Sequence, residues 1–121
     1  MADRMLFLGW GQVARGREER ALEVFNESMG LYGRMQQEGR IESFDVVLLD
    51  PHGGALEGYI ELHGSATQLA AVRDDEAFRR LMIDVSMIVD DLRVIDGYVG
   101  EGVAREMAIY TDSIAKVAQH S

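Results

Sequence analysis

Apolar and polar side chains alternate through residues 56–63, and this period of two predicts a β-strand with one buried face. Leu56, Ile60 and Leu62 share one side of that strand and should pack beneath helices. The other side carries four side chains that are mostly polar, namely Glu57, Tyr59, Glu61 and His63. What this polar side meets is the main question that the sequence raises.

Three further strands and four helices follow from the same kind of pattern. The strands are expected at residues 5–13, 41–50 and 92–99. Apolar positions three and four apart predict a helix over 17–38, ended by Gly39. Ser65 and Gln68 form a capping-box pattern that opens a short helix over 66–73. Asp74 or Asp75 then caps a longer helix, and the C-terminal helix is expected at about 102–119.

The resulting order, βαββαβ with an added C-terminal helix, predicts an α+β sandwich in a single domain over residues 1–121. The composition, with 47% hydrophobic and 27% charged residues, fits a soluble globular chain. Right-handed crossovers leave a gap beside the first strand that the hairpin strand fills. The predicted sheet order is therefore 4-1-3-2, which is the ferredoxin-like arrangement.

This arrangement places both crossover helices on one face of the sheet and leaves the other face bare. Residues 46–49 are apolar on both sides of their strand, whereas a strand with one solvated face would alternate. We therefore expect the bare face to be covered, either by a second copy of the chain or by the C-terminal helix.

Charge and composition exclude several classes of partner. A net charge of −9 and a pI near 4.7 oppose binding to a phosphate backbone, so no nucleic-acid partner is expected. The chain has no cysteine, which excludes disulfides and thiolate chemistry. The apolar run at residues 5–8 is too short for a signal peptide, and nothing approaches a membrane span, so a cytoplasmic location is expected.

The hairpin DPHGGALEGYIELHG and the helix pair SATQLAAVRDDEAFRRL give the chain a resemblance to the dimeric α+β barrel proteins. In that superfamily two ferredoxin-like subunits pack sheet against sheet, and the resemblance covers roughly residues 5–100. It implies a homodimer formed through the open sheet face. It also implies a pocket between the sheet and its helices or in the barrel interior.

The resemblance leaves the activity open. The family includes cofactor-free monooxygenases acting on aromatic substrates, haem-degrading oxygenases, lactone isomerases and members of unknown role. Its haem-degrading branch uses a helix histidine as axial ligand, and residues 66–90 contain no histidine. We therefore expect no cofactor. Its aromatic oxygenases pair Trp and Asn in the pocket, and Trp10 and Asn26 are the only such residues here.

Glu61 and His63 lie two apart on a strand and so project from the same face. A carboxylate beside an imidazole orients the ring, as a general base requires, so these two are the candidate catalytic residues. The alternative is a hydrogen-bonded polar pair across the dimer interface. No metal site is expected, because His52 in the turn lies too far from this pair within one subunit.

Four further side chains are candidate ligand-binding residues: Trp10, Gln12, Tyr59 and Tyr98. Trp10 also has a simpler interpretation as a core or interface residue, and Tyr59 and Tyr98 as residues that pack in the interface.

Two functions remain open at this stage. The first is a homodimeric protein that binds a small apolar or aromatic molecule in a cavity beside the sheet. The second is a cofactor-independent monooxygenase or isomerase in which His63 is the base and Glu61 orients it. Neither function requires a membrane. The sequence contains no GxSxG, P-loop or GxGxxG motif, so hydrolase, kinase and dehydrogenase functions of those types are excluded.

Overall fold

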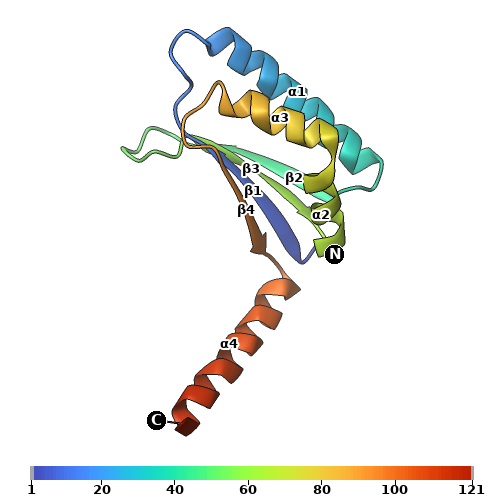
Figure 1. Cartoon of the computed structure of the whole chain (residues 1–121), viewed down its shortest axis with the longest axis vertical. Coiled ribbons are helices and arrows are strands. Elements are labelled where there is room, and N and C mark those ends of the chain that lie inside the picture. Colours follow the sequence, from blue (N-terminus) through green and yellow to red (C-terminus); the bar gives the residue numbers. More distant parts are fainter. Residues whose placement is uncertain (1, 121) are drawn as a thin grey trace.

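The computed structural model describes residues 2–120, with side chains up to Ala118 (Figure 1). The elements are β1 (Arg4–Trp10), α1 (Glu18–Gln37), β2 (Ser43–Leu48), β3 (Gly58–Gly64), α2 (Ala66–Asp74), α3 (Glu76–Ser86), β4 (Arg93–Tyr98) and α4 (Glu101–His120). This is the predicted βαββαβ order with an added C-terminal helix.

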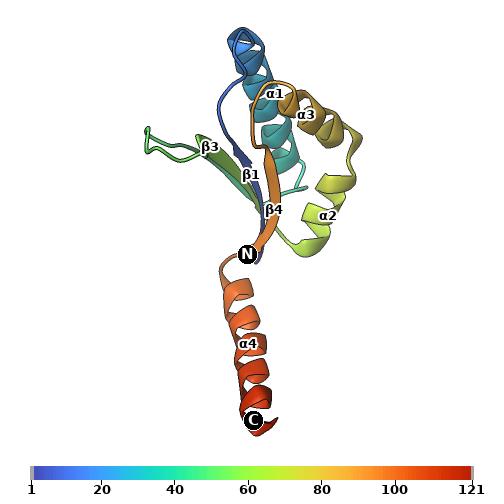
Figure 2. The same cartoon turned by 60° about the vertical axis from the view of Figure 1, so that its left-hand side comes forward.

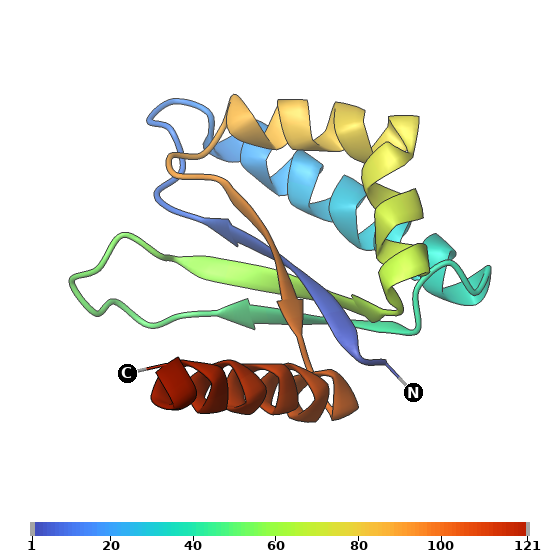
Figure 3. The ribbon, with the colours of Figure 1, turned by 60° about the horizontal axis from the view of Figure 1, so that its bottom comes forward.

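The four strands form one antiparallel sheet in the order β2-β3-β1-β4, which is the predicted order 4-1-3-2 counted from the opposite edge. The ferredoxin-like fold is therefore confirmed. Helices α1, α2 and α3 all lie on one side of this sheet, as Figures 1 and 3 show. The other side of the sheet is left without a helix layer, also as predicted.

The core lies between the sheet and these three helices. Leu6 and Leu8 of β1 pair with Leu62 and Ile60 of β3, and all four are buried on the helix side. The helices contribute the facing side chains, which are Val24, Leu31, Tyr32 and Met35 of α1, Leu69 and Val72 of α2, and Phe78 and Leu81 of α3. The predicted alternation along β3 is confirmed, because Tyr59, Glu61 and His63 lie on the open side.

The predicted helix starts are also confirmed. The Ser65 hydroxyl accepts a hydrogen bond of 3.1 Å from the Gln68 N–H, and the Gln68 side chain accepts one of 2.8 Å from the Ser65 N–H. The Gln68 amide also donates to the Gly39 carbonyl (3.0 Å), which ties the end of α1 to the start of α2. Asp75, not Asp74, caps α3 by accepting from the Phe78 N–H, and this bond and Arg40 lower the pKa of its carboxyl.

Strand β1 is shorter than the predicted 5–13 and ends at Trp10. The Gly11 N–H donates to the Asp90 carbonyl (2.7 Å), and the Asp90 N–H donates to the Gln12 carbonyl (2.8 Å). A side chain at Gly11 would lie 2.9 Å from the same Asp90 oxygen. The backbone thus leaves the sheet to pair with the α3–β4 loop, and only glycine allows this close approach.

The C-terminal helix does not cover the sheet of its own chain. Figures 1 and 2 show α4 projecting away from the end of the sheet where β4 finishes. Every residue from Met107 to Ala118 is exposed. Of the two coverings expected for the open face, the one by this chain's own helix is therefore not present. No helix in the described part of the chain is long and apolar enough to cross a membrane.

The capping box generates a stability prediction. Ser65→Ala removes the acceptor for the Gln68 N–H, so we expect the free energy of unfolding to fall by about 1 kcal/mol. Thr67→Ala, an exposed change in the same helical turn, is the control and should alter stability by less than about 0.5 kcal/mol. Urea denaturation of both variants measures the difference. Equal stabilities would contradict the capping role.

Candidate functional site

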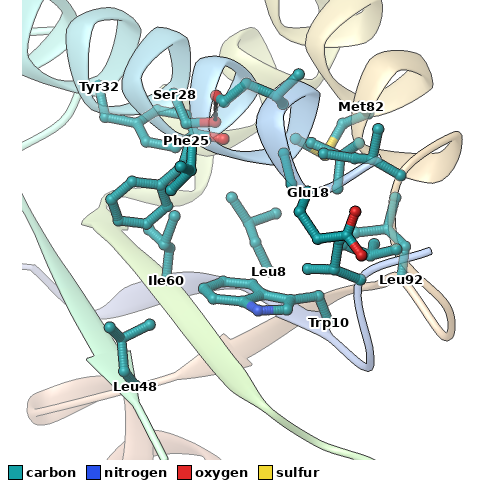
Figure 4. A pocket seen from close by; sticks show the side chains of 17 residues that line it. Leu8, Trp10, Glu18, Phe25, Ser28, Tyr32, Leu48, Ile60, Met82 and Leu92 are labelled. Atoms are coloured by element: carbon teal, nitrogen blue, oxygen red, sulfur yellow. Dashed lines mark hydrogen bonds between the residues drawn. The ribbon is translucent and has the colours of Figure 1, made fainter. Parts of the chain in front are cut away.

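A cavity of about 490 Å³ lies on the helix side of the sheet, between β1, β3 and the helices α1 and α3 (Figure 4). Leu8, Trp10, Ile60 and Leu48 project into it from the strands. The α1 side is formed by Ala21, Val24, Phe25, Ser28 and Tyr32, and the α3 side by Met82, Val85, Ile88, Val89 and Leu92. Val13, Glu18 and Leu22 complete the lining. Almost all of it is apolar.

The two loops at this end of the sheet hold the cavity open. The Ala14 N–H donates to the Ile88 carbonyl (2.7 Å), beside the two bonds that join the β1–α1 loop to Asp90. The Arg17 guanidinium reaches across to the Met87 carbonyl. These links fix the starts of α1 and β4 relative to each other. The separation between α1 and α3 near Trp10 is therefore set by backbone hydrogen bonds.

The position of the Trp10 side chain depends on the absence of a side chain at Gly58. Trp10 is the last residue of β1 and pairs with Gly58 at the start of β3. A methyl group at Gly58 would lie 2.7 Å from Cζ2 of Trp10 and 2.8 Å from the Val47 carbonyl. Because Gly58 has no side chain, the indole can lie flat against the β3 backbone and form part of the cavity floor. Its N–H makes no hydrogen bond to any other described residue.

The remaining polar groups of the cavity are few. The Ser28 hydroxyl is already engaged, donating to the Val24 carbonyl at 2.8 Å. The Tyr32 side chain is buried, and this burial raises the pKa of its phenol, so the group stays neutral. Glu18 is the one carboxylate in the lining, and it is exposed. The cavity thus suits an apolar or aromatic molecule with a small number of polar atoms.

The predicted catalytic pair lies on the opposite face of the sheet. The Nε2 atom of His63 is 3.2 Å from Oδ2 of Asp45 and 3.5 Å from Oε1 of Glu61. Neither contact has hydrogen-bond geometry, and this nitrogen is buried although the His63 side chain remains 18% exposed. Tyr59 stacks on Phe7 with ring centroids 5.0 Å apart on the same face. Strand alternation separates this group from the cavity by the thickness of the sheet.

The six predicted site residues therefore do not form one cluster. Trp10 lies in the cavity. Tyr59, Glu61 and His63 share the open face. Gln12 is exposed in the β1–α1 loop, and Tyr98 lies at the far end of β4, where the Arg4 guanidinium is 4.3 Å from its ring centroid. Among the residues that the structure describes, no three His, Cys, Asp or Glu side chains are arranged to hold a metal ion.

The helix residues that line the cavity, such as Phe25, Met82 and Val85, were not predicted as site residues from the sequence. They follow the same helical period as core residues, and the period does not distinguish a packed side chain from one that lines a cavity. One feature of the sequence does indicate the cavity, namely that the bulky Trp10 lies opposite Gly58. This pairing can be recognised only once the β1–β3 register is known.

The comparisons with known proteins confirm the fold and leave the function open. No protein-family model matches the sequence. No curated protein sequence matches it either. Among solved structures, a dimeric ferredoxin-like protein of unknown function from Bacteroides fragilis is similar, with 9% identity over 79% of this chain and 96% of its own, and a TM-score of 0.58.

Two further structures are similar at the same level. A protein of Arabidopsis thaliana has 14% identity, covers 83% of this chain and 90% of its own, and has a TM-score of 0.62. A candidate antibiotic biosynthesis monooxygenase from Chloroflexus aurantiacus has 14% identity, 80% and 94% coverage, and a TM-score of 0.50. The predicted resemblance to dimeric α+β barrel proteins is thus confirmed in the fold.

The contact of Gly58 with Trp10 generates a prediction for the site. Gly58→Ala should displace the indole, shift the emission of this single tryptophan and destabilise the protein by about 1–3 kcal/mol, because the added methyl overpacks the site. The control is Gly33→Ala in α1, where an added Cβ meets nothing within 4 Å. It should leave the emission unchanged and stabilise the helix by up to about 1 kcal/mol. Fluorescence spectra and thermal melts test both variants.

Proposed function

We propose that this chain forms a homodimer that binds a small apolar or aromatic molecule in the cavity between its sheet and helices α1 and α3. The observation that carries the proposal is the cavity itself, about 490 Å³ in volume and lined almost wholly by apolar side chains. Pockets for small molecules usually have volumes of roughly 300–1,000 Å³ and contain a few placed polar groups. The Trp10 N–H and the Glu18 carboxylate are the polar groups available here.

The cavity opens to solvent beside the exposed Leu22 and Leu48, but water inside it finds few polar partners. An ordered water needs two to four polar partners, and the lining offers few that are not already engaged. An aromatic molecule, in contrast, gains free energy by removing both its own surface and that of Phe25, Met82 and Trp10 from water. Glu18 is exposed at the cavity and carries a negative charge, so it favours a neutral or cationic ligand over an anionic one.

The open sheet face supports the dimer. It carries apolar and aromatic side chains that have no layer above them, including Phe7, Val47, Tyr59 and a half-exposed Ile95. A monomer that left this face in water would forgo the burial of these side chains. The similar protein from Bacteroides fragilis is described as dimeric.

The cytoplasmic location expected from the sequence stays a prediction.

Because Trp10 is the only tryptophan and lies in the cavity, its fluorescence reports directly on ligand binding. We expect the neutral probe N-phenyl-1-naphthylamine to quench Trp10 emission saturably. Val85→Phe, which fills the cavity, should weaken this binding at least about tenfold. Ile83→Phe places the same ring on the exposed side of α3 and should change the affinity by less than about twofold. No saturable quenching in the unchanged protein would contradict the proposal.

The second candidate function is a cofactor-independent monooxygenase or isomerase with His63 as general base. The observation in its favour is that the carboxylates of Asp45 and Glu61 flank the His63 imidazole, 3.2 Å and 3.5 Å from its Nε2 atom. Similarity to the candidate monooxygenase supports it further. Since His63 faces away from the cavity, its substrate would have to lie between the sheets of two copies.

His63→Ala separates the two roles of this histidine. As a base, His63 would be required for oxygen uptake with an activated aromatic substrate such as a dihydroxynaphthalene, and the variant should lose that activity while keeping its dimer. As an interface residue, its removal should weaken dimer association measured by sedimentation and leave probe binding in the cavity intact. Activity that persists in the variant excludes the catalytic role.

A further inference from the structure

Among the described residues, the contacts that join α4 to the start of its own chain lie at the first turn of the helix. Gly102 is buried, and a side chain there would collide with the Asp3 carbonyl. The Arg105 guanidinium pairs with the Asp3 carboxylate, and the Val99 N–H donates to the Asp3 carbonyl (3.1 Å). These contacts fix the direction in which α4 leaves the sheet. The first turn thus sets the direction of α4, and the side chains from Met107 to Ala118 are all exposed.

The projecting part of α4 carries an apolar stripe, which we define as Val103, Met107, Tyr110, Ile114 and Val117. The spacing of four, three, four and three places these side chains on one side of the helix. All five are exposed. Helices in water obtain most of their stability from packing such a face, and a lone helix of this length is only marginally stable. The stripe therefore requires a partner surface.

We propose that α4 is an intersubunit arm whose apolar stripe packs on the second copy of this chain, the copy that covers the open sheet face. This inference rests on the proposed homodimer. In a dimer formed through the sheets alone α4 would make no contact with the second copy, whereas here it packs against that copy.

The position of α4 favours a second copy as the occupant. Figure 3 shows α4 and the layer of α1 and α3 on opposite sides of the sheet. A subunit seated on the open face therefore lies on the same side of the sheet as α4. The helix is about 30 Å long, and the seven-residue strands are about 23 Å long, so the arm can extend along the whole of a neighbouring subunit.

Symmetry gives a second argument. In a two-fold dimer each subunit offers the same surfaces, so one association covers both open sheet faces and both stripes. Stable interfaces bury roughly 800 Å² of each partner. The central patch of Phe7, Tyr59 and Ile95 is interrupted by the polar Asp45 and Glu61. The α4 stripe adds a continuous apolar surface to the sheet face, on which apolar and polar side chains are mixed.

A lipid surface fits the helix less well. Glu101, Glu106 and Asp112 accompany only Arg105 and Lys116 among the described side chains of α4, and the whole chain carries a charge of −9. Anionic membrane surfaces attract helices rich in Lys and Arg and repel acidic ones.

Thiol labelling tests the arm in the full chain, because the natural sequence contains no cysteine. Ile114→Cys lies in the stripe and Ile109→Cys lies outside it, and the two isoleucines are exposed to similar extents in a single subunit, 53% and 59%. At concentrations where sedimentation shows a dimer, we expect the thiol at 114 to react at least about tenfold more slowly than the thiol at 109. On dilution to monomer the two rates should become equal.

Each other outcome overturns the arm in a distinct way. Equal rates in a preparation that is dimeric would refute the arm and leave the dimer standing. Protection at 114 that survives dilution to monomer would show that the helix folds onto its own chain. A monomer at every concentration would refute the dimer and the arm together.

A charge in the stripe provides a second measurement that does not depend on thiol chemistry. Ile114→Glu should raise the dimer Kd at least about tenfold, because it places a carboxylate in the interface. Ile109→Glu, the same change outside the stripe, should leave the Kd within about twofold. Circular dichroism checks that both variants keep their helix content. Identical Kd values would overturn the proposal.

Discussion

Both crossover connections of this sheet pass over the same face, because right-handed connections from β1 to β2 and from β3 to β4 place α1 and the α2–α3 pair on one side. One face is therefore covered by helices and the other is not. Strand alternation then assigns each residue of β1 and β3 to a layer. Ile60 contributes to the cavity, while its neighbours Tyr59 and Glu61 contribute to the open face. The two candidate sites are separate as a direct consequence.

The fold could be predicted from the sequence because its signals are local. The alternation in β3, the Ser65–Gln68 capping box and the stop at Gly39 each depend on residues within one turn or strand. Topology rules then supplied the strand order. The end of β1 was predicted too late because it depends on a distant partner: Gly11 pairs with Asp90, nearly eighty residues away. Gly11 and Gln12 are followed by the apolar Val13, so the local pattern does not mark Trp10 as the last residue of the strand.

The candidate site was only partly predictable, for a related reason. A cavity is a volume that side chains fail to fill, and it depends on the spacing of helices more than on the type of residue at any one position. Trp10 was identified from its chemistry, but its neighbours in the cavity come from α1 and α3 and have the pattern of ordinary core residues. The candidate pair of Glu61 and His63 was correctly expected on the open face. Its relation to Trp10 was not visible without the register, which puts Gly58 opposite the indole and His63 on the reverse side.

The uncovered surfaces and the cavity both act against the stability of this small domain. An apolar cavity reduces the packing that stabilises the fold, and the open sheet face and the α4 stripe reduce it further in a single copy. Leu48 illustrates the first effect, since it lines the cavity on the helix side of edge strand β2 and is 70% exposed. In the proposed homodimer, association of two copies would offset the second loss and a bound molecule would offset the first, each by mass action. On this proposal the chain retains a cavity because the second copy supplies apolar contacts that its own core lacks.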